Sequence, residues 1–243
     1  MRPSVLILPL LLAACTDSAM RPRRLTGARV SPAVWGVLEL PRTPGPHPAV
    51  VLVPGSYGFR PDYARFARAF ADSGFVALAI DYYAVTGKGF FQSQQIRSWP
   101  VWQETIRNAV AWLDTLPAVS GMPVGLVGYS RGAFLSISVG ASTPGVGAVV
   151  DYYGGGPADS IAGQPWHFPP LLILHGEADN TVSVSLAHLL HDAVLARGGE
   201  VEMQLYPRAG HAFNGPWSVE YSETDATDAW RRTIDFLRRR LVR

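Results

Sequence analysis

Ser130 is the residue whose neighbourhood most clearly indicates covalent chemistry. It stands in Gly128-Tyr129-Ser130-Arg131-Gly132, between the apolar run 124–127 and a stretch that favours a helix. A serine on a tight strand-to-helix turn is held above the end of the sheet, and flanking glycines are needed there because larger side chains would clash. This context predicts that Ser130 is a nucleophile, although G-x-S-x-G on its own is a frequent chance match.

A serine hydroxyl needs a base to take its proton and a carboxylate to orient that base. After a serine turn of this kind, the acid comes next along the chain and the histidine follows the acid. Asp179 and His211 fit this order, and each lies just after a short apolar run. We therefore expect Ser130, Asp179 and His211 to form a catalytic triad, with Asp151 and Glu177 as rival acids.

The elements that would position these residues alternate between short apolar strands and amphipathic helices. Such alternation predicts an α/β fold with a mostly parallel sheet and helices on both of its faces. Strands are expected at 34–40, 49–53, 75–80, 124–127, 146–152, 171–175 and 201–206, and helices at 61–73, 99–116, 131–141, 183–197 and 225–240. No repeat or linker divides residues 25–243, which we interpret as one domain. The stretches 84–98 and 154–170 lack periodicity and are candidates for the walls of a pocket.

The composition excludes several classes of function. Of the 243 residues, 48% are hydrophobic and 16% are charged, which excludes wholesale disorder. The net charge is only +2, and arginines gather in the last 13 residues, where we expect them on the solvated side of a helix. A nucleic-acid partner is therefore not expected. The single cysteine excludes an internal disulfide and a multi-cysteine metal site, and we expect no cofactor or metal.

The N-terminus is typical of an export signal. One base precedes an apolar run that ends at residue 14 and is too short to span a bilayer. Leu12-Ala13-Ala14-Cys15 resembles the bacterial lipobox, whose cysteine is lipidated and becomes the mature N-terminus. We expect a lipoprotein signal peptide at 1–14, lipidation at Cys15 and a tether at 15–24. The protein would then be exported and held at a membrane by its lipid, with an ordinary secretory signal as the alternative.

Beyond the triad, the chain resembles the dienelactone hydrolase family of α/β-hydrolases over about residues 32–242. The matching pieces are 48–53 with Gly58, Asp81-Tyr82-Tyr83, the serine turn, Tyr153-Gly154-Gly155, His175-Gly176 with Asp179 and Val182, Tyr206 with Gly210-His211-Ala212-Phe213, and Ala229-Trp230. The resemblance implies an α/β-hydrolase fold and the same triad. In that fold the oxyanion hole would use the backbone N–H groups of Arg131 and of the 54–58 loop, there Ser56.

Two departures from the family bear on the substrate. The founding enzymes of the family carry cysteine where this chain has Ser130, and they bind a carboxylated lactone through a glutamate and an arginine. The equivalent positions here are Gly55 and Val85. The resemblance therefore implies a serine carboxylesterase that acts on small or medium esters through an acyl-enzyme, rather than a dienelactone hydrolase in the strict sense.

Three other functions stay open at this point. A faint resemblance to acyl-CoA thioesterases and acyltransferases, in 49–58 and 81–84, suggests thioester hydrolysis or acyl transfer, but export makes coenzyme A an improbable substrate. A serine peptidase of the same superfamily is another alternative. An inactive, surface-anchored binding protein is the third. The sequence leaves the oligomeric state open.

Aromatic and histidine side chains complete the candidates. Aromatic residues after the third strand and after His211 suggest an apolar acyl or alcohol site as readily as core packing; they are Phe90, Phe91, Trp99, Trp102, Trp217 and Tyr221. His175 is interpreted as a packing and hydrogen-bonding residue, His188 and His191 as solvated helix residues, and His167 as a candidate for the pocket wall.

Overall fold

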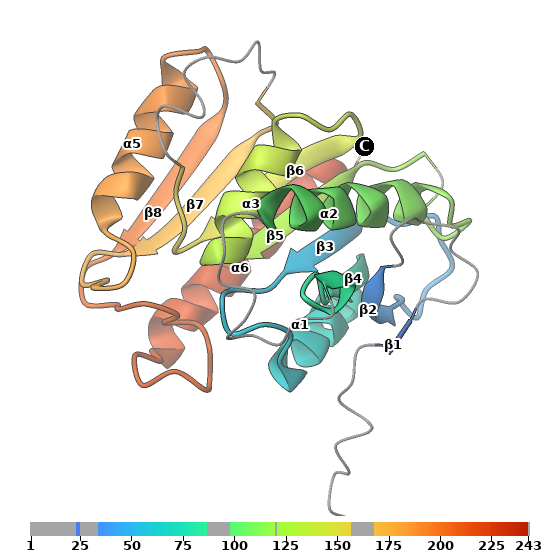
Figure 1. Cartoon of the computed structure of the whole chain (residues 1–243), viewed down its shortest axis with the longest axis horizontal. Helices are drawn as coiled ribbons and strands as arrows, with labels where there is room; N and C mark the ends of the chain where they lie inside the picture. Colours follow the sequence, from blue (N-terminus) through green and yellow to red (C-terminus); the bar gives the residue numbers. More distant parts are fainter. Residues whose placement is uncertain (1–22, 25–33, 87–97, 120, 157–167, 243) are drawn as a thin grey trace, which may run out of the picture.

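The structure of the chain is a computed structural model, which describes residues 23–24, 34–86, 98–119, 121–156 and 168–242. In these residues an eight-stranded sheet runs in the order β1-β2-β4-β3-β5-β6-β7-β8. Strands β3 to β8 are parallel to one another. At one edge, β2 runs antiparallel to both of its neighbours, β1 and β4. The predicted α/β class and the mostly parallel sheet are confirmed (Figure 1).

The strands are β1 (Arg23–Arg24), β2 (Trp35–Glu39), β3 (Ala49–Val53), β4 (Val76–Ile80), β5 (Val124–Tyr129), β6 (Val146–Tyr152), β7 (Leu171–Gly176) and β8 (Val201–Tyr206). The helices are α1 (Pro61–Asp72), α2 (Trp99–Asp114), α3 (Arg131–Gly140), α5 (Val184–Leu195) and α6 (Glu223–Leu241), with a 3-10 turn η2 at Ala84–Thr86.

The observed elements differ from the expected ones mainly at their ends. Strand β5 continues to Tyr129, two residues beyond the predicted end, so the strand leads directly into Ser130. Residues Arg23–Arg24, assigned to the tether from the sequence, pair with β2. The predicted signal peptide and Cys15 lie outside the described residues. None of the helices in the described part of the chain has the length and apolar character needed to span a bilayer.

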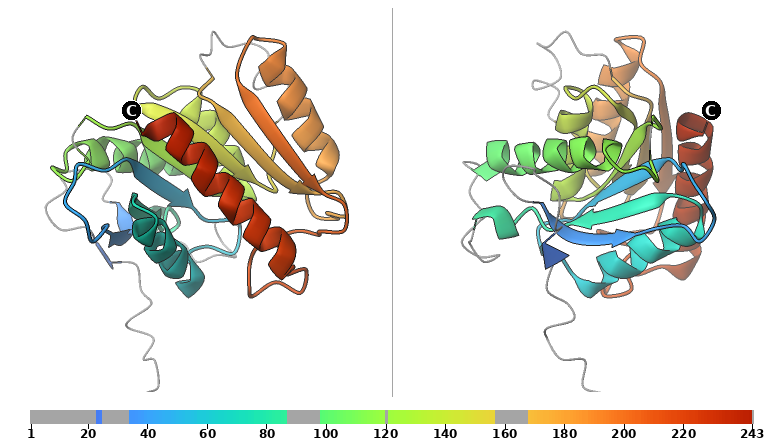
Figure 2. Two further views of the ribbon diagram at one scale, coloured as in Figure 1. Left: turned by 180° about the vertical axis from the view of Figure 1, so that it is seen from behind. Right: turned by 90° about the vertical axis from the view of Figure 1, so that its right-hand side faces the viewer.

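Helices cover both faces of the sheet because its central strands are apolar on both sides. All five residues of β3 are buried, as is typical of a parallel strand between two helical layers. Val51 belongs to the core formed with α2, α3 and α5, whereas Val50 and Leu52 belong to the core formed with α1 and α6. This alternation follows from the two-residue period of a strand. Figure 2 shows α6 lying across the face opposite to α2 and α3.

Helix α6 covers the same face of the sheet as α1, and its large side chains pack against a glycine of the sheet. The leucines Leu237 and Leu241 are fully buried, and a side chain at Gly125 would come within 3.0 Å of both. The hydroxyl oxygens of Tyr152 and Thr233 lie 2.7 Å apart and join β6 to this helix. Ser222 accepts a hydrogen bond from the N–H of Asp225 and caps the helix.

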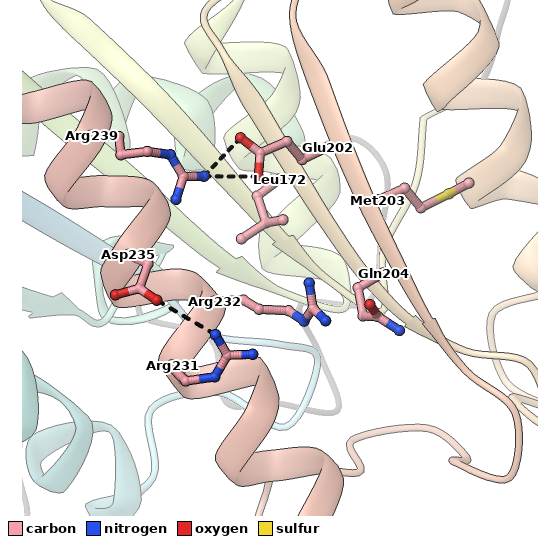
Figure 3. A pocket seen from close by; sticks show the side chains of 8 residues that line it. All are labelled: Leu172, Glu202, Met203, Gln204, Arg231, Arg232, Asp235 and Arg239. Atoms are coloured by element: carbon pink, nitrogen blue, oxygen red, sulfur yellow. Dashed lines mark hydrogen bonds and ion pairs between the residues drawn. The ribbon is translucent and has the colours of Figure 1, made fainter.

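Most arginines of α6 are at least partly exposed and form ion pairs with acids, as expected for a solvated helix face. Figure 3 shows the shallow pocket between α6 and β8, where Arg239 contacts both carboxylate oxygens of Glu202 and Arg231 contacts Asp235. Asp228 also accepts hydrogen bonds from Arg231 and Arg232. These ion pairs offset part of the positive charge that the arginines bring to the helix.

Truncation of Leu237 tests whether α6 belongs to the core. The Leu237→Ala variant should lower the free energy of unfolding by about 2–5 kcal/mol, since the buried side chain leaves a cavity behind. Leu189→Ala is the matched control, because Leu189 on α5 is 48% exposed and its loss should cost little. Chemical denaturation measures both, and equal losses would contradict the packing described.

Candidate active site

Ser130 sits on a strained turn between β5 and α3. Its φ of 53° and ψ of −120° lie in a region that non-glycine residues rarely adopt. The turn is possible because of its two glycines. A Cβ at Gly132 would overlap the backbone carbonyls of Val53 and Pro54, and a Cβ at Gly128 would overlap the backbone of Ala133. The close packing of α3 against the end of β3 thus requires glycine in the serine motif.

Asp179 lies in the loop after β7, where backbone groups hold its carboxylate. Its Oδ1 accepts hydrogen bonds from the N–H groups of Thr181 and Val182, each at 2.8 Å. Burial alone would raise the pKa of the Asp179 carboxyl, but the bonds from His211, Val182 and Thr181 outweigh burial and lower it. The carboxyl group is therefore ionised at neutral pH.

His211 connects the carboxylate to the serine. Its Nδ1 lies 2.7 Å from Asp179 Oδ2, and its Nε2 lies 3.0 Å from Ser130 Oγ. Because an ionised carboxylate can only accept, Nδ1 carries the proton and Nε2 presents a lone pair to the serine hydroxyl. The three side chains that the sequence proposed as a triad are thus in one continuous line of hydrogen bonds. This arrangement can move a proton from Ser130 to His211.

The neighbouring His175 supports the loop that carries Asp179. Its buried ring donates from Nε2 to the carbonyl of Val182 at 2.9 Å and lies 3.5 Å from Asp179 Oδ2. Burial lowers the pKa of His175, so the ring is neutral at neutral pH. These contacts agree with its interpretation as a packing and hydrogen-bonding residue.

The rival acids do not reach the histidine. Asp151 is fully buried at the end of β6, where its Oδ1 accepts from the N–H of Gly154 at 2.7 Å. Its Oδ2 has no hydrogen-bond partner among the described residues. Glu177 is exposed at the surface beyond β7. Neither carboxylate has a hydrogen bond to His211 in the described part of the chain, so the structure favours Asp179 as its partner.

The loop 54–58 lies against the serine turn. A Cβ at Gly55 would come within 3.3 Å of Ser130 Cβ, which places this backbone beside the nucleophile. Ser56 and Ser130 line the same cavity, and Arg131 is the first residue of α3. The N-terminus of a helix presents N–H groups and a partial positive charge. The two residues expected to form the oxyanion hole therefore flank Ser130 from two elements.

A cavity of about 640 Å³ opens above the triad. The structure adds wall residues that the sequence analysis did not propose for the pocket, namely Tyr57, Arg60, Tyr63, Tyr129, Tyr153, Asn180, Thr181 and Glu220. The guanidinium of Arg60 lies 5.3 Å from the ring centre of Trp217, another wall residue. The tyrosines come from α1, β5 and two loops, so no sequence periodicity indicates that they share a wall. Their common wall could be recognised only after the strands had been ordered.

The aromatic residues proposed for the pocket lie in different places in the structure. Trp217 lines the cavity, whereas Trp102 is fully buried and Trp99 packs against the core of the α2 face. Tyr221 is partly exposed at the surface and is not among the wall residues. Phe90, Phe91 and His167 lie outside the described residues.

Backbone strain is concentrated at this cavity. In the described residues, the non-glycine residues with positive φ are Ser130, Tyr153 and Ala212, and all three line it. Such conformations each cost about 1–3 kcal/mol and persist only where the surrounding structure enforces them. Their clustering marks the cavity above the triad as the functional site.

His188 and His191, the two histidines of α5, show no metal arrangement. His188 is exposed on α5, and His191 contacts Asp192 through Nδ1 at 3.0 Å. In the parts of the chain that the structure covers, no group of three or more His, Cys, Asp or Glu side chains is placed to hold a metal ion.

Comparison with known proteins links this geometry to a family. The model of the dienelactone hydrolase family matches residues 34–241. A protein of Methylorubrum extorquens that carries the name carboxymethylenebutenolidase is 28% identical over 216 residues, which cover 82% of this chain and 74% of that protein. A protein of Escherichia coli K12 with the same name is 25% identical over 210 residues, covering 80% and 78%.

Solved structures agree in the fold. A crystal structure named for a dienelactone hydrolase of Klebsiella pneumoniae superposes with a TM-score of 0.73 at 20% identity, covering 84% of this chain and 92% of that one. A dienelactone hydrolase-like promiscuous phosphotriesterase from metagenomic libraries gives 0.72 at 21% identity, covering 91% and 97%. These likenesses confirm the α/β-hydrolase fold expected from the sequence.

The buried Asp151 generates a prediction on pH dependence. Burial raises its pKa to about 7, although the hydrogen bond from Gly154 opposes the shift. In an unfolded chain the pKa is about 3.9. Because the folded value is the higher one, the stability that this group contributes is fully present below about pH 4 and is lost as the pH rises through about 7.

Asp151→Asn keeps an acceptor for the N–H of Gly154 and removes the ionisation. The variant should therefore gain thermal stability relative to the parent protein on going from pH 5 to pH 8. Thermal unfolding at both pH values measures this difference. A difference in melting temperature that does not change with pH would show that Asp151 does not titrate in this range.

Proposed function

The chain belongs to the dienelactone hydrolase family of α/β-hydrolases, and from this premise we propose that it is a serine carboxylesterase acting on small or medium esters. Its membership makes it a hydrolase. The observation that carries the finer proposal is the line from Ser130 Oγ to His211 Nε2, at 3.0 Å, and from His211 Nδ1 to Asp179 Oδ2, at 2.7 Å. No other serine in the described residues has both a histidine and a carboxylate in such a line.

The proposed reaction begins with attack of Ser130 Oγ on the ester carbonyl while His211 Nε2 accepts the hydroxyl proton. The resulting imidazolium is stabilised by Asp179, which also holds the proton on Nδ1. When the tetrahedral intermediate collapses, His211 gives the proton to the leaving alkoxide, and an acyl-enzyme remains. Water, activated by His211, then attacks the acyl group and releases the carboxylic acid.

The negative charge on the former carbonyl oxygen needs donors that are already in place. We assign this role to the backbone N–H groups of Ser56 and Arg131, because they flank Ser130 from the 54–58 loop and from the start of α3. Loss of one such donor typically costs about 10²–10³-fold in rate. Since the backbone supplies the donors, substitution of these two side chains alone does not test the assignment.

The wall of the cavity supports an ester substrate with an apolar part. Tyr57, Tyr63, Tyr153 and Trp217 offer aromatic faces and edges near the nucleophile. The carboxymethylenebutenolidase name of the relatives refers to a carboxylated lactone, whose family partners are replaced here by Gly55 and Val85. We therefore place simple carboxylic esters ahead of that lactone as substrates. Thioester hydrolysis, acyl transfer and peptide hydrolysis remain alternatives, but no contact described in the site favours any of them.

We also propose that the protein is exported and anchored to a membrane by lipid on Cys15. The support is the apolar run that ends in Leu12-Ala13-Ala14-Cys15, with the only cysteine of the chain at its end. More than one acyl chain on a single residue gives stable anchoring, whereas one chain alone would be marginal.

Replacement of the nucleophile tests the enzymatic proposal. Ser130→Ala should lower kcat for a short p-nitrophenyl ester by at least about 10³-fold, because the acyl-enzyme can no longer form. Ser136→Ala is the matched control, since Ser136 lies buried on α3, the helix that follows Ser130, and its Oγ has no hydrogen-bond partner among the described residues. The control should keep its turnover.

Labelling with a fluorophosphonate separates an esterase from an inactive binding protein. The parent protein should be labelled at Ser130 and the Ser130→Ala variant should not. Unchanged turnover in Ser130→Ala, or no labelling of the folded parent protein, would contradict the proposal.

Replacement of Cys15 tests the anchor separately. Cys15→Ser should move the protein from the membrane fraction to the soluble fraction of the producing bacterium, because lipid can no longer be attached. Mass spectrometry of the parent protein should find an N-terminal acylated cysteine. Continued membrane fractionation of Cys15→Ser would show that something else retains it there.

A further inference from the structure

Three side chains that the triad does not use form a chain of hydrogen bonds beside Ser130. Arg131 donates from Nη1 to the hydroxyl of Tyr83 at 3.0 Å. The hydroxyl oxygens of Tyr83 and Tyr82 lie 3.2 Å apart. The hydroxyl of Tyr82 donates to the carbonyl oxygen of Pro54 at 2.9 Å. A continuous path therefore leads from the residue after the nucleophile to the first residue of the 54–58 loop.

The protons in this chain can be assigned from what each group is able to do. A guanidinium only donates, a carbonyl only accepts, and a phenol has a single proton to give. The hydroxyl of Tyr82 donates to the carbonyl oxygen of Pro54 and, over a longer distance, to the hydroxyl oxygen of Tyr83. The hydroxyl of Tyr83 accepts from Arg131 and donates to the carbonyl oxygen of Ser56 at 3.5 Å. Linked hydrogen bonds of this kind polarise one another, and the charged Arg131 donor strengthens its own bond to Tyr83.

Packing keeps the chain in a single geometry. Tyr82 and Trp102 are fully buried, and the ring centres of Tyr82 and Tyr83 lie 5.4 and 5.1 Å from that of Trp102. The guanidinium of Arg131 lies 5.8 Å from the same ring. Burial, reinforced by the neighbouring Tyr83, raises the pKa of Tyr82, so its hydroxyl stays a donor across the working pH range.

The two ends of the chain are attached to the two parts of the proposed oxyanion hole. Arg131 begins α3 and offers one backbone N–H, and Pro54 begins the loop that offers the N–H of Ser56. Tyr63 holds the next residue of that loop, because its hydroxyl accepts from the N–H of Gly55 at 3.1 Å. The loop is thus fixed from α1 and from the Tyr82–Tyr83 segment after β4.

We propose that the Arg131 side chain, Tyr83 and Tyr82 are positioning residues that set the distance between the two donors of the oxyanion hole. The inference rests on the proposed function, since it assumes the serine esterase mechanism. Oxyanion donors act only when they lie about 2.7–3.1 Å from the place that the developing charge will occupy. Release of Pro54 would let the loop shift by more than this tolerance, while the triad itself would stay intact.

Tyr82→Phe and Arg131→Met each break the chain at one end and keep a side chain of similar size. Each should lower kcat for p-nitrophenyl acetate by about tenfold, less than for complete loss of a donor, with little change in KM. The double variant should lose hardly more than either single variant, because both break the same chain. Tyr152→Phe is the control. It removes a buried phenol that bonds Thr233 on α6, and it should keep its activity.

A second measurement separates positioning from a general loss of structure. Ser130 Oγ adds to the carbonyl carbon of a trifluoromethyl ketone and gives a hemiketal with an oxyanion. The matching methyl ketone binds mainly without this addition. The inhibition constant of the methyl ketone divided by that of the trifluoromethyl ketone should fall about tenfold in Tyr82→Phe and Arg131→Met, because oxyanion stabilisation weakens. Because both inhibitors are measured on one sample, a smaller folded fraction leaves the ratio unchanged.

The outcomes distinguish this inference from the proposed function. If the parent protein hydrolyses the ester and both variants keep the parent inhibitor ratio, the positioning role is wrong and the esterase proposal stands. If the fold-losses in kcat of the two single variants multiply in the double variant, the two ends act separately. That result would contradict a positioning role for the hydrogen-bonded path. If the parent protein has no turnover and no labelling at Ser130, both proposals fall together.

Discussion

The buried carboxylate of Asp179 can stay ionised only because both of its oxygens accept hydrogen bonds. Two backbone N–H groups bind Oδ1, and the ring N–H of His211 binds Oδ2. An unpaired charge in that place would be expelled by desolvation or neutralised by a proton. The same bonds fix the tautomer of His211, and with it the lone pair that faces Ser130. Without this bond, the serine would be an ordinary hydroxyl on a strained turn.

The sheet makes the meeting of these residues possible. Parallel strands end at one edge, so the loops after β5, β7 and β8 open on the same side and bring Ser130, Asp179 and His211 together. Close packing at this edge forces several residues into unfavourable backbone conformations. Gly132 lets α3 approach the end of β3, and the left-handed conformations of Ser130, Tyr153 and Ala212 surround the cavity. A rigid core below the site holds these unfavourable conformations in place.

The chemistry of the site depends on backbone groups as much as on side chains. Pro54 and Gly55 are held by phenols from separate elements, the Tyr82 hydroxyl after β4 and the Tyr63 hydroxyl of α1. Tyrosine suits this task because its ring packs into the core while its hydroxyl reaches a single polar partner. The aromatic residues near the nucleophile thus have two roles: some line the cavity, and others hold the loop beside Ser130.

Local patterns were enough to predict most of the strands and helices, the serine motif, and the candidate base and acids, because each depends on neighbours in the sequence or on chain order. Strand β5 reached two residues further than its apolar run, since Gly128 and Tyr129 take part in the ladder with β6. The choice of Asp179 over Asp151 required coordinates, because both follow apolar strands and only distance separates them. The tyrosine wall of the cavity and the path from Arg131 to Pro54 were also decided by tertiary structure alone. In that path, the bond from Tyr82 to Pro54 joins residues 28 apart and the bond from Arg131 to Tyr83 joins residues 48 apart, and only the strand order brings them into contact.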